Sequence, residues 1–210
     1  MTDLDSVYAE RRSRFLKPVA ARLEHLILDY LGDTPHIDRV SARAKSVERF
    51  VAKSRKLNDD GKKKYNDPLN QIQDQVAARI VVFYPCDVEK VEDVVVNYFR
   101  PIESKPHIPD SEDKFGYEGK HFILFIPDDV KPLSDVTDND PKFFELQIKT
   151  LFQHAWSEAS HDVAYKPTSG ELTTGQKRRV AFAAAQAWGG DMIFNDLVEE
   201  LTSKIDGPVG

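Results

Sequence analysis

The sequence predicts an α+β fold, in which a mixed β-sheet is flanked by helices near both ends of the chain. Two observations lead to this prediction. Apolar residues recur at helical spacing in residues 6–31 and 176–205, which predicts an N-terminal and a C-terminal helix. Between them, residues 77–85, 121–127 and 142–149 are apolar or alternating segments, which are typical of strands.

Composition places the chain among ordinary globular proteins. Its 210 residues suit one sizeable domain, and 40% of them are hydrophobic and 30% charged. No apolar run approaches the roughly 20 residues that span a bilayer, and the N-terminus shows no signal-peptide pattern. Cys86 is the single cysteine, which excludes an internal disulfide. We therefore expect a cytoplasmic protein with no membrane partner, and its net charge of -6 argues against general nucleic-acid binding.

Two helices and a loop are expected in the N-terminal part of the chain. The helix at 6–31 is closed by Gly32. A second helix is predicted over residues 40–56, where basic residues are concentrated although the chain is acidic overall. Residues 58–70 have turn composition and predict a loop.

Strands and helices alternate through the rest of the chain. The continuous apolar run at 77–85 predicts a central strand. The further elements expected, in chain order, are a helix at 88–99, an edge strand at 102–108, a loop at 108–120, strands at 121–127 and 142–149, and helices at 150–164 and 176–205.

The strand FFELQIKT carries an unusual polar face. Phe144 and Leu146 point to one side, whereas Glu145, Gln147 and Lys149 point to the other. A carboxylate, an amide and a cation in one row could bind a metal or a proton, orient a substrate and hold a phosphate. The alternative is the solvated face of an antiparallel sheet.

Basic and acidic residues earlier in the chain suggest the same chemistry. Asp74 lies just before an apolar strand, where a carboxylate can hold Mg²⁺ together with substrate phosphates. Lys45, Arg49 and Lys53 recur every four residues, so they would share one face of the expected helix and could grip a triphosphate. The alternatives are a loop aspartate and a solvated cationic surface.

Two further groups are candidates for a binding site. In FGYEGKH, Tyr117 lies between glycines and could stack on a purine base, or it could pack on the core. His154, Glu158 and His161 lie four and three residues apart, on one face of a helix. A zinc site would need another ligand, so packing and hydrogen bonding around a site is the favoured interpretation.

The order of these groups resembles the synthetase domain of the RelA/SpoT family, in particular its short single-domain members, the small alarmone synthetases. The resemblance covers residues 39–167. ELQIKT resembles the family's E-x-Q-I-R-T strand, which is its most specific motif. The segments that resemble other family motifs are ARAKSVERFVAK, DQVAARI, FGYEGKH and HAWSEASHDVAYK.

The resemblance implies a fold, a domain layout and a reaction. It implies a mixed sheet of nucleotidyltransferase-like type in a single synthetase domain, with an N-terminal helix in 1–38, a catalytic core in 39–167 and a C-terminal helix in 168–210. The reaction is a Mg²⁺-dependent transfer of pyrophosphate from ATP to the 3′-hydroxyl of GDP or GTP, which makes guanosine tetraphosphate or pentaphosphate. In short members of the family the outer helices often support homo-oligomers.

The resemblance also implies a role for each site residue. Asp74 and Glu145 would bind Mg²⁺, Glu145 could instead help to deprotonate the 3′-hydroxyl, and Gln147 would orient the acceptor. The expected ATP-binding residues are Arg43, Lys45, Lys53 and Arg79, of which Arg79 would stack on adenine. The expected acceptor-binding residues are Tyr117, His121 and Lys149.

Departures from the family motifs lie on the acceptor side. Gly119 replaces the serine of the glycine-tyrosine loop, and Lys149 replaces the arginine of the strand motif, which loses a bidentate donor. One alternative is therefore a toxin-like relative that modifies the 3′ end of tRNA or adenine nucleotides. A third possibility is a catalytically inactive nucleotide-sensing module, against which the retention of both carboxylates argues.

Overall fold

The computed structural model describes residues 4–106, 119–134, 136–165 and 172–205. Five strands form one sheet in the order β1-β2-β5-β4-β3. Neighbouring strands are antiparallel except β2 and β5, which are parallel, so the predicted mixed sheet is confirmed. The strands are β1 (Ile37–Ala44), β2 (Val76–Val82), β3 (Pro101–Pro106), β4 (Lys120–Phe125) and β5 (Phe143–Thr150).

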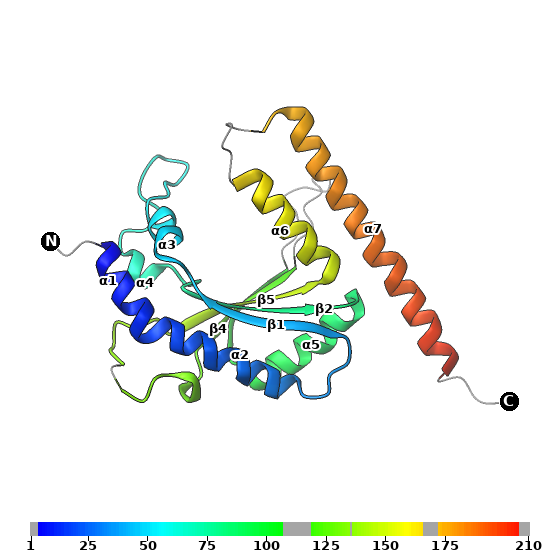
Figure 1. The fold of residues 1–210 in the computed structure, drawn as a ribbon, viewed down its shortest axis with the longest axis horizontal. Helices are drawn as coiled ribbons and strands as arrows, with labels where there is room; N and C mark the ends of the chain where they lie inside the picture. The colour runs from blue at the N-terminus through cyan, green and yellow to red at the C-terminus, as the bar shows by residue number, and fades with distance from the viewer. Residues whose placement is uncertain (1–3, 107–118, 135, 166–171, 206–210) are drawn as a thin grey trace.

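Helices cover both faces of this sheet (Figure 1). On one face lie α2 and α5, and on the other lie α6 and the long C-terminal helix α7. The helices are α1 (Leu4–Arg11), a π-helical turn (Arg12–Leu16), α2 (Lys17–Leu31), α3 (Val47–Ser54), α4 (Pro68–Gln71), α5 (Pro85–Tyr98), α6 (Leu151–Tyr165) and α7 (Thr174–Ile205), with a 3₁₀ turn at Asp128–Val130. No helix of the described residues is long and apolar enough to cross a membrane.

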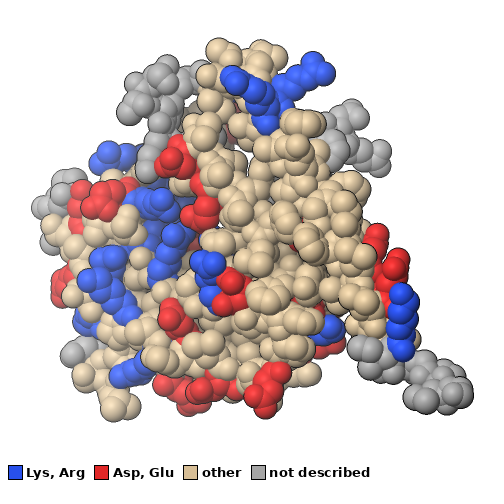
Figure 2. Space-filling view, turned by 45° about the vertical axis from the view of Figure 1, so that its right-hand side comes forward, with Lys and Arg blue, Asp and Glu red and all other residues tan. Residues whose placement is uncertain are grey.

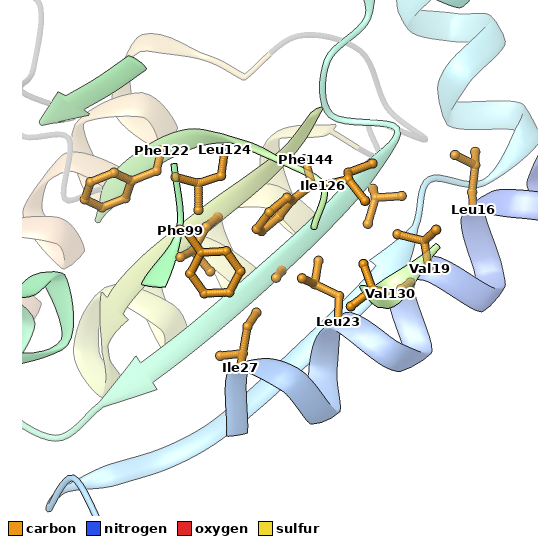
Figure 3. Close-up of a cluster of buried hydrophobic side chains, with 14 of the residues drawn as sticks. Leu16, Val19, Leu23, Ile27, Phe99, Phe122, Leu124, Ile126, Val130 and Phe144 are labelled. Atoms are coloured by element: carbon orange, nitrogen blue, oxygen red, sulfur yellow. The ribbon is translucent and has the colours of Figure 1, made fainter. Parts of the chain in front are cut away.

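The hydrophobic core lies between the sheet and the layer of α2 and α5. Leu23 and Ile27 of α2 point toward Phe99, Leu124 and Phe144 (Figure 3). All five side chains are buried. Because each such side chain contributes about 2 kcal/mol when it leaves water, this layer fixes the position of the sheet on which the polar face is built.

The expected helix over residues 40–56 is wrong in its first half. Residues Ile37–Ala44 form β1, which pairs antiparallel with β2, and the helix begins only after Ser46. The hydroxyl of Ser46 accepts a hydrogen bond from the backbone N–H of Arg49 and so caps α3. The pairing with β2 outweighs the helical propensity of the alanines in this segment.

Two other expectations need comment. The segment 58–70 is not only loop, because Leu57 and Lys63 form an isolated bridge and α4 begins at Pro68. Strand β3 lies at the edge of the sheet, as predicted, and it begins and ends with a proline. Proline is tolerated there because an edge strand has a hydrogen-bonded neighbour on one side only.

Candidate active site

Polar residues from four strands form a row across the face of the sheet that lies against α6. The strand register pairs His121 with Gln147, Gln147 with Arg79, and Arg79 with Ser41. Paired residues point to the same face of a sheet. The polar face of β5 therefore continues across the neighbouring strands.

A second row lies directly beside the first. The register pairs Glu145 with Ala77 of β2, and Ala77 with Arg43 of β1. The small side chain of Ala77 leaves space between the carboxylate and the guanidinium, and all three residues line a cavity of about 230 Å³. The sheet thus brings together an anion and a cation that lie 102 positions apart in the sequence.

The carboxylate of Glu145 is held by two neighbours. His121 Nδ1 lies 3.1 Å from its Oε1, and Gln147 donates a hydrogen bond of 2.7 Å to the same oxygen. Burial alone would raise the pKa of Glu145, but the hydrogen bonds from His121 and Gln147 outweigh burial and lower the pKa to about 2. Glu145 is therefore ionised at neutral pH, which suits a cation ligand better than a general base in the free protein.

Asp74 lies in the same cavity and contacts two lysines. Lys45 Nζ and Lys53 Nζ each lie 2.9 Å from Asp74 Oδ2. The other carboxylate oxygen, Oδ1, is buried and has no hydrogen-bond partner among the described residues. Asp74 therefore holds Lys45 and Lys53 close together through one oxygen, and its other oxygen is buried without a partner among the described residues.

A larger cavity of about 480 Å³ lies beside the first one. The two cavities share Arg43, Arg49 and Gln147. The larger one is also lined by further predicted site residues and by part of α6, namely Arg79, His121, Lys149, Trp156, Ser157, Glu158, Ser160 and His161. Cationic walls and an adjoining pair of carboxylates are the features expected of a site for polyphosphates and Mg²⁺.

The face of α6 that carries His154 and Glu158 contacts this site through Arg79. Arg79 Nη1 lies 3.0 Å from His154 Nδ1 and donates a hydrogen bond of 2.6 Å to Glu158 Oε1. His161 lines the same cavity. In the part of the chain that the structure describes, no group of three or more His, Cys, Asp or Glu residues could hold a metal ion. His154 and Glu158 thus support the site through Arg79.

Gly119 approaches β5 closely. A Cβ at this position would lie 2.2 Å from the carbonyl oxygen of Ile148 and 2.5 Å from Cγ of Lys149. Backbone and side chain would both have to shift, so only glycine fits here. The serine expected from the family motif is therefore incompatible with this packing of the chain. Tyr117, predicted to stack on the acceptor base, lies outside the described residues.

The N-terminal helix supports the site in a way that sequence reasoning did not identify. The hydroxyl of Tyr8 and the Nε of Arg12 both donate to the backbone carbonyl of Lys45, at 3.1 and 3.0 Å. The ring of Tyr8 also stacks on Phe50 of α3. No local pattern could have revealed these contacts, because 37 positions separate Tyr8 from Lys45.

Fold and site together define a class, an α+β domain with cation-lined cavities beside two carboxylates. The chain belongs to the RelA/SpoT family, because the family model described as "Region found in RelA / SpoT proteins" matches residues 42–170. This finding confirms the resemblance seen in the motifs.

Individual relatives agree with the family assignment. The GTP pyrophosphokinase YjbM of Bacillus subtilis (strain 168) is 25% identical over 188 residues, which cover 83% of this chain and 82% of the relative. Small alarmone synthetase 1 from Bacillus subtilis has a similar structure, with a TM-score of 0.68, 22% identity and coverage of 89% of this chain and 95% of that chain. The same enzyme bound to its product pppGpp gives a TM-score of 0.67 at 20% identity, covering 93% of this chain and 94% of that one. These similarities confirm the predicted fold.

Proposed function

We propose that this protein is a GTP diphosphokinase, which transfers pyrophosphate from ATP to the 3′-hydroxyl of GDP or GTP and makes the alarmone guanosine tetraphosphate or pentaphosphate. The observation that carries this proposal is the cavity in which Asp74 and Glu145 lie beside Arg43 and Lys45. Its residues match the family's donor-side motifs, and YjbM is named a GTP pyrophosphokinase. A cytoplasmic location remains a prediction.

The donor nucleotide would bind where the cations are concentrated. Arg43, Lys45 and Lys53 would hold the phosphates of ATP, and Arg79 would stack on adenine. In the free protein both lysines are held by Asp74 Oδ2. A polyphosphate offers them more negative charge than one carboxylate does, so we expect them to move to the phosphates when ATP binds. Small alarmone synthetase 1 from Bacillus subtilis has a structure bound to the ATP analogue AMPCPP, which supports nucleotide binding by this chain.

Asp74 and Glu145 would bind Mg²⁺. Both line the same cavity, both offer the oxygen ligands that Mg²⁺ prefers, and Asp74 Oδ1 is buried without a hydrogen-bond partner among the described residues. When bound, Mg²⁺ would offset charge on the β- and γ-phosphates. The hydrogen bonds from His121 and Gln147 keep Glu145 ionised and fix its orientation toward this position.

The acceptor would occupy the His121 end of the larger cavity, which in the strand register lies on the other side of Gln147 from Arg79 and so from the adenine. Gln147, His121 and Lys149 line it, so an amide, an imidazole and an ammonium group are available to the ribose and phosphates of GDP or GTP. Tyr117 would stack on guanine. The acceptor oxygen would attack the β-phosphorus of ATP in line. The new O–P bond would form as the bond from that phosphorus to the α–β bridging oxygen breaks, AMP would leave, and the hydroxyl proton would pass to solvent.

A transfer assay tests this proposal. Purified protein, Mg²⁺ and ATP labelled on its γ-phosphate would be mixed with GDP, GTP, adenine nucleotides or deacylated tRNA in separate reactions. We expect label on GDP or GTP. Label only on tRNA or adenine nucleotides would instead support the toxin-like alternative, and no transfer by protein that binds ATP would support the sensing module.

We propose that α7 mediates self-association with a second copy of the chain. The helix exposes large apolar side chains, among them Phe182 (65% exposed), Ile193 (63%) and Leu201 (60%). Ile193 and Leu197 are four positions apart and so lie on the same side of the helix. Figure 2 shows few charged side chains along the surface between the two ends of α7. An apolar surface of this kind is typical of an interface. We expect the native chain to be larger than a monomer in light scattering, and Ile193→Glu to reduce its mass.

A further inference from the structure

The guanidinium group of Arg79 is held along its edge by three side chains. Its Nε and Nη2 both donate to Gln147 Oε1, at 3.3 and 3.2 Å. Its Nη1 donates to Glu158 Oε1 at 2.6 Å and lies 3.0 Å from His154 Nδ1. All three nitrogens of the group are therefore engaged by strand β5 and helix α6.

These contacts restrain the guanidinium but leave its faces available. The N–H donors of arginine lie in the plane of the group, so hydrogen bonds to them do not cover its faces. A planar cation of this kind stacks on aromatic rings. Arg79 lines the 480 Å³ cavity together with Arg43, and 18% of its side-chain surface is exposed, so a ligand in that cavity can reach the guanidinium.

The charge of Glu158 also counters repulsion between two arginines. Arg43 is a diagonal neighbour of Arg79 on the same sheet face, because Arg79 pairs with Ser41. Partial burial and the nearby cation of Arg79 lower the pKa of Arg43, as expected for two guanidinium groups that are diagonal neighbours. Glu158 is the carboxylate that contacts Arg79 directly, so it partly compensates this positive charge.

We infer that Glu158 and His154 are positioning residues, which hold the edge of Arg79 so that its face can stack on the base of the donor nucleotide. They lie four positions apart on α6, and both reach the same nitrogen of Arg79. Neither needs to touch the reacting phosphates. The inference rests on the proposed function, because it assumes that the donor nucleotide binds beside Arg79.

The inference predicts a large effect on binding of the base and a small one on binding of the phosphates. Without Glu158, the guanidinium would lose its strongest edge contact and adopt several orientations, which weakens stacking. Two of the three cations that would hold the phosphates, Lys45 and Lys53, contact Asp74. The third, Arg43, is affected by the charge of Glu158. A ligand that has three phosphates but no base should therefore respond much less than the nucleotide.

The experiment compares two ligands by isothermal titration calorimetry with Mg²⁺ and no acceptor. One is a non-hydrolysable ATP analogue, and the other is inorganic tripolyphosphate. The variants are Glu158→Ala and Glu158→Gln, with Glu89→Ala as a matched control, because Glu89 is an exposed glutamate of α5 on the other side of the sheet. Thermal melting would verify that each variant is folded.

For Glu158→Ala we expect the Kd of the ATP analogue to rise about fivefold and that of tripolyphosphate to change less than about twofold. Glu158→Gln should recover part of the affinity, since its amide oxygen still accepts from Arg79, and Glu89→Ala should match the native chain. In turnover, the KM for ATP should rise while kcat stays within about twofold.

Two outcomes would overturn the inference in different ways. If the native chain bound the analogue and Glu158→Ala bound it equally well, the positioning role would be wrong and the proposed function would stand. Equal weakening of both ligands would show a general structural role of Glu158, which also contradicts the inference. If the native chain bound neither ligand, the proposed function itself would fail.

Discussion

The two faces of strand β5 are built in different ways. Phe144, Leu146 and Ile148 are fully buried against the layer of α2 and α5, where each contributes mainly by its size and apolar surface. Glu145 and Gln147, on the opposite face, are joined by hydrogen bonds to β2, β4 and each other. Substitutions on the first face should change stability, whereas those on the second should change the chemistry.

The largest effect is expected for Glu145→Gln. The change keeps the shape of the side chain but removes the charge that would bind Mg²⁺, so we expect the rate of pyrophosphate transfer to fall about 10³-fold. The melting temperature should fall little. A variant that kept more than a tenth of the native rate would show that the two faces are not divided as described.

Leu146→Ala tests the other face at the neighbouring position. Removing a fully buried leucine leaves a cavity, so we expect a loss of about 3 kcal/mol in the free energy of unfolding. Urea denaturation at constant temperature measures this loss. Below the transition, the folded variant should retain a rate near the native value; a 10³-fold loss of rate would mean that the core face also sets the chemistry.

Gly119→Ala tests how closely the start of β4 approaches β5, because it introduces one methyl group between them. The added Cβ would meet the carbonyl oxygen of Ile148 at 2.2 Å, so the backbone must move. We expect a loss of about 2 kcal/mol in the free energy of unfolding. Gly175→Ala is a suitable control, since a Cβ there would have no neighbour within 4 Å. Equal stability of both variants would contradict the close approach.

Substitution of Asp140 should have the smallest effect on the free energy of unfolding, and this effect depends on pH. Burial would raise its pKa, but hydrogen bonds from Arg14 and Thr137 outweigh burial, so the pKa lies below its ordinary value. A lowered pKa stabilises the folded state above the ordinary pKa of about 4, and this contribution is lost as pH falls through the lowered pKa. Asp140→Asn should therefore cost about 1 kcal/mol at pH 7. Urea denaturation between pH 7 and pH 2 should show the difference shrink as pH falls; a constant difference would contradict the charge-based origin.

Sequence periodicity predicted the parts of the fold in which one face is apolar. The alternation in β5 and the apolar run in β2 were sufficient, because burial on one or both faces leaves a clear pattern. In β1 the inward residues are Val40, Ala42 and Ala44, all only partly buried, and two of them are good helix formers. The pattern of that strand is therefore weak, and its pairing with β2 decides its structure.

The candidate site was predictable to the extent that family motifs mark it. Asp74 and Glu145 come together at one cavity, and Lys45 and Lys53 both reach Asp74, although Lys45 is not on a helix as expected. The supporting contacts were not predictable. Tyr8 and Arg12 reach the carbonyl of Lys45 across more than 30 positions, and such contacts leave no local spacing to detect.

The order of the strands has a consequence for how the protein is made. β5 lies in the middle of the sheet, yet it is the last of the five strands to leave the ribosome. Until then β2 and β4 each lack the neighbour that β5 provides, and their unpaired backbone groups resemble the open sheet edges through which chains aggregate. The nascent chain can close its sheet and assemble its polar rows only after Thr150 has emerged, so the interval before β5 inserts is the period of greatest exposure to misfolding.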